Sequence, residues 1–116
     1  MKRKLAYINA PWGTDEVENT EKAAEHCRVI YEAGYSPICP ILFLPLFLHD
    51  SIPQEHKDAV DMAREYLCRS HVLVVCGHNA TEQVKSDIAV AERFHIPATT
   101  REGIEAVMKQ GRGQHA

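Results

Sequence analysis

The stretch "HVLVVCGHNATEQVKSDIAVAERFHIP", residues 71–97, decides the fold class. Four of its first six residues are valine or leucine, which predicts a buried strand that ends at Gly77. Residues 79–95 predict a helix, and Asn79 with Glu82 three residues later forms a variant of the capping box. The stretch ends with a further short strand, and this strand–helix–strand order is typical of a parallel α/β sheet.

The same alternation runs through the rest of the chain. Further strands are expected at residues 4–10 and 35–39, and further helices at residues 14–33, 54–69 and 102–109. This order implies a short parallel sheet of four to five strands with helices on both faces, which is a three-layer α/β sandwich. Such sheets bind ligands beyond the carboxyl ends of their strands, at the topological switch point. The loops at residues 9–13 and 77–81 are therefore expected to border a ligand.

The length and charge of the chain limit the possible functions. The 116 residues suffice for one domain, which we expect at residues 1–110 with a disordered tail at residues 111–116. The net charge of -3 argues against nucleic acid as a partner. The basic start does not resemble a signal peptide, and the most apolar window, residues 41–48, is too short to cross a bilayer. These features predict a cytoplasmic protein that has no membrane partner.

Four cysteines and seven histidines raise the question of a metal site. No two cysteines form a C-x-x-C pair, and the closest approach, Cys76 and His78, matches no standard zinc spacing. We therefore expect reduced thiols, no metal and no cofactor.

The loop after the first strand lacks the features of a phosphate cradle. Gly13 is its only glycine, and three carboxylates follow it, so a polyphosphate would meet repulsion there. Tyr7 and Asn9 can form hydrogen bonds and Trp12 offers a face for stacking, so the loop suits a neutral sugar or base better. The alternative is that Tyr7 and Trp12 are ordinary core or rim aromatics, and the sequence leaves both interpretations open.

Asp87 is the second candidate. It lies beside an apolar stripe that repeats at helical spacing, formed by Val84, Ile88, Ala91 and His95. A carboxylate at the edge of such a stripe is either a solvated rim residue or a site residue with a shifted pKa. If the strand at residues 4–10 lies beside the strand at residues 71–76, Tyr7 and Asp87 could face the same crevice.

Several segments together resemble one known family. They are "YINAPW", "EN…A…C", "AGYSPICPILFLPLFLHD", "VLVVCG" and "TEQVKSDIAVAERFHIP". From about residue 4 to residue 97 the chain resembles the nucleoside 2-deoxyribosyltransferase-like domains, particularly the small, mostly uncharacterised members found in phages and Gram-positive bacteria. The resemblance implies a flavodoxin-like fold, a nucleoside or nucleotide ligand, and a homo-oligomer with shared active sites. It also implies that Asp87 stands where a glutamate attacks the anomeric carbon, and Tyr7 where a tyrosine positions that carboxylate.

The other candidates are expected to contact the ligand from the two loops and the third helix. They are Asn9, Pro11, Trp12, Gly13, Gly77, His78, Asn79 and Gln83. Asp61, His78 and His71 are candidates for the general acid that protonates the leaving base. Lys85 and Arg101 are the cations nearest to the two loops, and either can also be an ordinary surface cation.

The chain departs from the family pattern at four positions. Asp87 replaces a glutamate, Gln83 a glycine, His71 an aspartate and Ile41 a histidine. The shorter Asp87 side chain withdraws the carboxylate by roughly 1 Å, a displacement that can cost on the order of 100-fold in rate.

Three hypotheses for the function follow. The first is an enzyme with N-glycosidase or deoxyribosyltransferase-like activity. The second is a non-catalytic nucleotide-binding protein, for example a phage protein that captures a nucleotide-derived defence signal. The third is a small oligomeric domain whose crevice is incidental.

Overall fold

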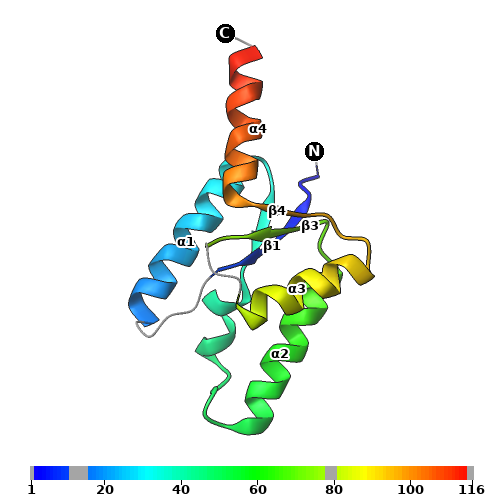
Figure 1. Cartoon of the computed structure of the whole chain (residues 1–116). Coiled ribbons are helices and arrows are strands. Elements are labelled where there is room, and N and C mark those ends of the chain that lie inside the picture. Colours follow the sequence, from blue (N-terminus) through cyan, green and yellow to red (C-terminus); the bar gives the residue numbers. More distant parts are fainter. Residues whose placement is uncertain (1, 11–15, 78–80, 115–116) are drawn as a thin grey trace.

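The computed structural model describes residues 2–10, 16–77 and 81–114 (Figure 1). Within these residues, four parallel strands form one sheet in the order β2-β1-β3-β4. The strands are β1 (Leu5–Asn9), β2 (Ser36–Ile38), β3 (Val72–Val75) and β4 (Ala98–Thr100). This arrangement confirms the predicted flavodoxin-like α/β class, with four strands in the described sheet.

The two central strands define the switch point of the sheet. Tyr7 and Asn9 of β1 lie opposite Leu73 and Val75 of β3, whereas β2 pairs with the other edge of β1. The chain therefore leaves β1 towards one side of the sheet and returns to the other side at β3. The crevice beyond the carboxyl ends of β1 and β3 is the expected place for a ligand.

Helices cover both faces of this sheet, as Figure 1 shows. One face carries α1 (Glu16–Glu32) and α4 (Arg101–Gln114), and the other carries α2 (Pro53–Cys68) and α3 (Glu82–Arg93). Because side chains alternate along a strand, Ala6 and Ile8 of β1 pack with α1 and α4. Tyr7 points to the opposite face and packs with residues of α2 and α3.

The predicted end of the first helix is confirmed. Gly34 has a φ of 100°, and its N–H donates to the Tyr31 carbonyl at 2.9 Å. The next N–H, from Tyr35, donates to the Ile30 carbonyl at 3.3 Å. These two bonds form a Schellman motif, which requires a residue that accepts a positive φ at this position.

The third helix begins later than predicted. Its N-cap is Thr81, whose Oγ1 accepts a hydrogen bond from the Val84 N–H at 3.2 Å, so the helix starts at Glu82. Asn79, the predicted cap, lies outside the described residues.

The buried face of α3 also differs from the predicted stripe. Asp87 and Ala91 are its buried residues, at 7% and 1% exposure. His95 is exposed and follows the helix with a φ of 58°, so its predicted place in the stripe is wrong. Asp87 therefore lies within the buried face of α3, whereas the sequence pattern places it at the edge of that face.

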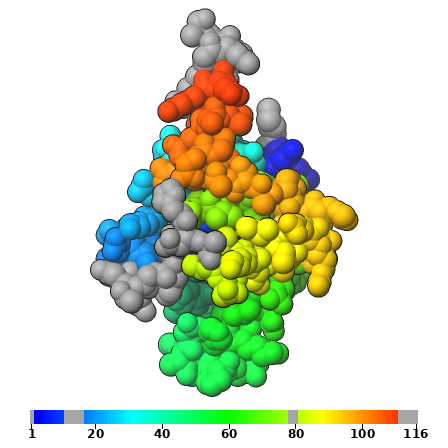
Figure 2. Space-filling view, in the orientation of Figure 1, coloured from blue at the N-terminus to red at the C-terminus, as the bar shows by residue number. Residues whose placement is uncertain are grey.

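The last helix, α4, continues to Gln114 instead of ending near residue 109. Figure 2 shows this helix projecting at one end of the molecule, with α2 at the opposite end. The principal extents are 53 × 32 × 29 Å, which fits this elongated shape. The assignment of residues 1–110 as one domain stays a prediction.

The apolar segment between β2 and α2 contains two short 3-10 turns, η1 (Pro40–Leu42) and η2 (Leu44–Leu46). Leu44 is 5% exposed, whereas Leu46 and Phe47 are 82% and 57% exposed. The segment is therefore divided between side chains that pack inward and side chains that face solvent. No helix in the described ranges is long and apolar enough to cross a membrane.

Candidate functional site

A pocket of about 670 Å³ lies at the carboxyl end of β1, on the face that α2 and α3 cover. Its walls come from residues 7–10, from the segment at residues 40–51, from one side of α2 and from the first turns of α3. This volume lies in the range of small-molecule sites. The pocket therefore lies beyond the carboxyl end of β1, one of the two strands at the switch point, and none of the described residues of β3 lines it.

Asp87 lines the pocket and is held by two hydrogen bonds. The Asn9 side chain donates from Nδ2 to Asp87 Oδ2 at 2.5 Å, and the Gln83 side chain donates from Nε2 to Asp87 Oδ1 at 3.0 Å. Asn9 is the last residue of β1, and Gln83 lies one helical turn before Asp87. The strand end and the helix thus fix both carboxylate oxygens.

The environment of Asp87 raises its pKa. Burial is the largest cause, because it disfavours the charged form. The hydrogen bonds from Asn9 and Gln83 and the nearby charge of Arg64 oppose this effect by favouring the carboxylate. A buried carboxylate with opposing influences of this kind, in a pocket, is typical of functional sites.

Tyr7 also lines the pocket and is 5% exposed. Burial raises its pKa, and the charge of Asp87 acts in the same direction, so the phenol stays neutral. Among the described residues, Asn9 and not Tyr7 donates the hydrogen bond from β1 to Asp87. The catalytic role of Tyr7 stays a prediction.

The structure brings together four of the predicted site residues, namely Tyr7, Asn9, Gln83 and Asp87. Gly77 follows β3 with a φ of 117°, is exposed, and is not part of the pocket wall. The remaining predicted contacts, Pro11, Trp12, Gly13, His78 and Asn79, lie outside the described residues.

Two of the predicted general acids do not line the pocket. His71 precedes β3, and its Nδ1 accepts a hydrogen bond from the Leu5 N–H at 2.9 Å, at the amino end of the sheet. Asp61 lies on the exposed side of α2 and pairs with Lys57 at 3.7 Å. Neither side chain can therefore protonate a group bound beside Asp87.

From one wall of the pocket, only Ile41 is singled out by the sequence. Residues of α2 and the preceding segment form this wall: Pro40, Ile41, Leu44, Pro45, Leu48, His49, Asp50, Ser51, His56, Ala59, Val60, Ala63 and Arg64. Within it, His56 Nδ1 lies 2.7 Å from Asp50 Oδ1, which ties the first turn of α2 to the segment before it. His56, Val60 and Arg64 share one side of α2 because they follow one another at every fourth residue, but this spacing does not distinguish a pocket wall from a solvated helix face.

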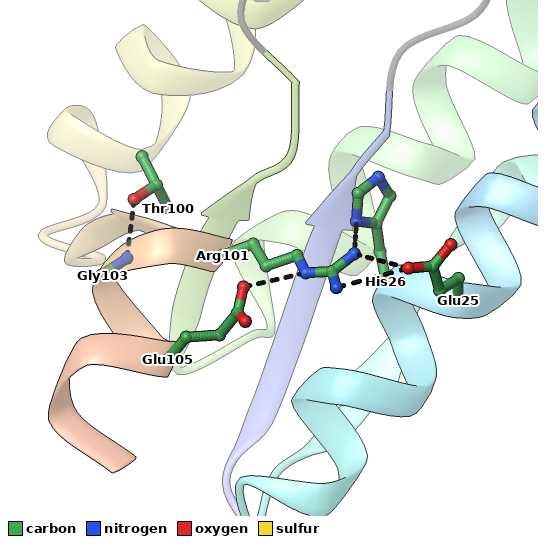
Figure 3. A network of polar contacts seen from close by, with 6 residues as sticks. All are labelled: Glu25, His26, Thr100, Arg101, Gly103 and Glu105. Atoms are coloured by element: carbon green, nitrogen blue, oxygen red, sulfur yellow. Dashed lines mark hydrogen bonds and ion pairs between the residues drawn. The ribbon is translucent and has the colours of Figure 1, made fainter. Parts of the chain in front are cut away.

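Arg101 belongs to a separate polar network, shown in Figure 3. Its Nε bonds Glu105 at 3.0 Å, its Nη1 lies 2.9 Å from His26 Nδ1, and its guanidinium reaches Glu25 at 3.4 Å. These contacts join the start of α4 to α1. Arg101 does not line the pocket, and neither does Lys85, which pairs with Glu82 at 3.7 Å.

The described residues contain no group of three or more histidine, cysteine, aspartate or glutamate side chains that could hold a metal ion. All four cysteines, Cys27, Cys39, Cys68 and Cys76, are free thiols.

One family model, described as a domain of unknown function (DUF7768), matches residues 4–101. The chain belongs to the DUF7768 family. The match spans β1, α2 and α3, so it includes every element that forms the pocket of this DUF7768 chain.

Among solved structures, the chain is similar to a 2-deoxyribosyltransferase from the psychrotolerant bacterium Bacillus psychrosaccharolyticus. The TM-score is 0.65 and the sequence identity is 12%, over 83% of this chain and 70% of that chain. At this identity the likeness shows a shared fold. No curated protein matches the chain.

Proposed function

We propose that the pocket binds a nucleoside or nucleotide and that Asp87 acts on its N-glycosidic bond. The observation that carries this proposal is the placement of a buried carboxylate, held by Asn9 and Gln83, in the wall of a pocket at the carboxyl end of β1. The fold shared with a 2-deoxyribosyltransferase supports the same chemistry.

In the proposed reaction, an Asp87 oxygen attacks the anomeric carbon while the bond from that carbon to the base nitrogen breaks. The bonding electrons leave with the base, which takes a proton from a general acid. Water or a second base then displaces Asp87 and restores the carboxylate. His49 and His56, which line the pocket, are the proposed acids in place of His71 and Asp61.

Further parts of the proposal concern residues beyond the pocket wall. We propose that residues 11–13 and 77–79 contact the ligand. We also propose that the protein is a cytoplasmic homo-oligomer. The exposed Leu46 and Phe47 support association with a second copy, because contact between copies would remove their apolar surface from water.

A non-catalytic nucleotide-binding protein is the second candidate function. One observation favours it: both Asp87 oxygens already accept hydrogen bonds, which makes either oxygen a weaker nucleophile. The aspartate is also one methylene shorter than the glutamate of the resembling transferases. In this case Asp87 would bind a sugar hydroxyl without attacking the sugar.

The test is to incubate the protein with nucleosides, deoxynucleosides, nucleotides and NAD and to follow free base by chromatography. We expect base release that Asp87→Ala lowers on the order of 100-fold or more. Asp61→Ala is the control, because that carboxylate is exposed on α2 outside the pocket. Asp87→Glu should raise the rate if the shorter side chain limits the attack.

The outcomes separate the two functions. Ligands that raise the melting temperature without any base release would favour the binding protein. The absence of both base release and thermal stabilisation would contradict both functions.

A further inference from the structure

Arg64 is the only lysine or arginine among the described residues that line the pocket. We infer that the ligand is a nucleoside monophosphate and not the uncharged nucleoside, and that Arg64 binds its phosphate. This inference rests on the proposed function and specifies its substrate class.

The position of Arg64 on α2 directs it into the pocket. His56, Val60 and Arg64 lie at intervals of four residues along one side of the helix, and all three line the pocket. Arg64 is also close enough to Asp87 for its charge to favour the carboxylate, although the two side chains form no ion pair. Arg64 and Asp87 therefore line the same pocket without an ion pair between them.

Arg64 also lacks a partner within the part of the chain that the structure describes. The neighbouring cations Lys57 and Arg69 each pair with a carboxylate four residues away, at 3.7 and 2.8 Å. The residues four positions on either side of Arg64 are Val60 and Cys68, which cannot form an ion pair. Arg64 is exposed and makes no hydrogen bond or ion pair with any described residue, so its donors are available to a ligand.

The chemistry of the pocket fits three parts of a nucleotide. Asp87 with its two donors suits the sugar. The apolar wall suits the base and consists of Ile41, Leu44, Pro45, Leu48, Ala59, Val60 and Ala63. Phosphate is the anionic group that a nucleoside carries, and the planar fork of a guanidinium binds phosphate through two parallel hydrogen bonds. Arg64 is matched by two carboxylates in the pocket wall, Asp50 and Asp87, so a single phosphate is favoured, because a polyphosphate would bring further negative charge towards both of them.

The experiment compares affinities for nucleosides with those for their 5′- and 3′-monophosphates, using the full chain at fixed ionic strength and isothermal titration calorimetry. The probes are the four common deoxynucleosides, the four common ribonucleosides and their monophosphates. We expect a monophosphate to bind at least about 10-fold more tightly than its nucleoside. Arg64→Met should abolish this difference and leave nucleoside affinity within about 2-fold, since methionine keeps the apolar stem.

Arg69→Met is the matched control, because Arg69 is an exposed arginine near the end of α2 that does not line the pocket. It should keep the preference for the monophosphate. Arg64→Lys keeps the charge but loses the fork, so it should give an intermediate preference.

Several results would overturn the inference. Equal affinity of the wild-type protein for nucleosides and monophosphates would refute it and leave the proposed function intact. An equal loss of both affinities in Arg64→Met would do the same. If no nucleoside or monophosphate binds the wild-type protein, the inference and the proposed function fail together.

Discussion

The Asn9 side chain donates a 2.5 Å hydrogen bond to the Asp87 carboxylate, joining the last residue of β1 to α3 across 78 positions of sequence. The amide stabilises the charged form of a carboxylate that burial disfavours. Asn9 therefore controls how readily Asp87 ionises.

The first prediction concerns Asn9→Ala. Removal of this donor should raise the pKa of Asp87, because the charged form then loses one of the contacts that stabilise it against burial. An NMR titration of the Asp87 carboxyl carbon measures the change, and the acid limb of any base-release activity should move to higher pH with it. Gln54→Ala is the control, since the Gln54 amide bonds Asp58 on α2 and does not line the pocket. An unchanged titration in Asn9→Ala would contradict this role.

The second prediction concerns stability. Burial raises the pKa of Asp87 in the folded state, so the folded chain binds this proton more tightly than the unfolded chain does. Ionisation of Asp87 therefore costs stability as the pH rises through the folded pKa. Asp87→Asn removes the charge and keeps the shape, and the exposed Gln83 amide can turn to accept from it. We expect a gain on the order of 1 kcal/mol at pH 7, or roughly 4 °C in melting temperature.

This gain should shrink as the pH falls towards the ordinary aspartate pKa of about 3.9, where both side chains are neutral. Thermal unfolding of both proteins at a series of pH values is the measurement. A variant that is less stable at pH 7 would show that the ionised carboxylate, with its two donors, is favourable where it lies.

The third prediction concerns the network of Figure 3. The Arg101 side chain is 19% exposed and contacts Glu105, Glu25 and His26, so Arg101→Met should weaken the contact between α4 and α1. We expect a loss of about 1 to 2 kcal/mol in the free energy of unfolding by urea. Arg69→Met, which breaks only an exposed pair with Glu65, should cost less than about 0.5 kcal/mol. Equal losses in the two variants would mean that the network does not join the helices.

The fourth prediction concerns His26 in the same network. Burial lowers its pKa, as does the charge of Arg101, while Glu25, Glu102 and Glu105 oppose the shift. As the pH falls through the ordinary histidine pKa of about 6.5, the unfolded chain gains this proton before the folded chain does. The free energy of unfolding therefore decreases as the pH falls. His26→Gln removes that contribution, because the glutamine amide stays neutral and can accept from Arg101.

Unfolding by urea at pH 7.5 and pH 5 measures this effect. The stability difference between the two pH values should be smaller in His26→Gln than in the wild-type protein. The same difference in both proteins would assign the acid sensitivity to other groups.

Local patterns in the sequence predict much of this fold and one side of its site. The valines of β3, the alternation of strands and helices, and the glycine after α1 are signals that depend on neighbouring residues alone. Asp87 stands out for a similar reason, because it lies at the edge of an apolar stripe that repeats at helical spacing. The start of α3 is harder to predict, since Asn79 and Thr81 are both common cap residues and the capping-box spacing from Asn79 to Glu82 favoured Asn79, whereas the N-cap is Thr81.

The α2 wall depends on contacts that local sequence does not encode. His56, Val60 and Arg64 mix polar and apolar residues as a solvated helix face does, so their pattern suggests exposure to water. They line a pocket because residues 40–51 fold back over the same side of the sheet. That arrangement is a long-range contact, and only the structure reveals it.

The two sides of the pocket are built differently, so one side can tolerate substitutions that the other cannot. The carboxylate is held by a strand end and a helix, whereas the opposite wall includes a segment with only two short 3-10 turns and no strand pairing to the sheet. Substitutions in that segment can reshape the cavity without loosening the β1–α3 connection. The shape of the pocket can therefore change by small steps while the Asp87 carboxylate stays in place.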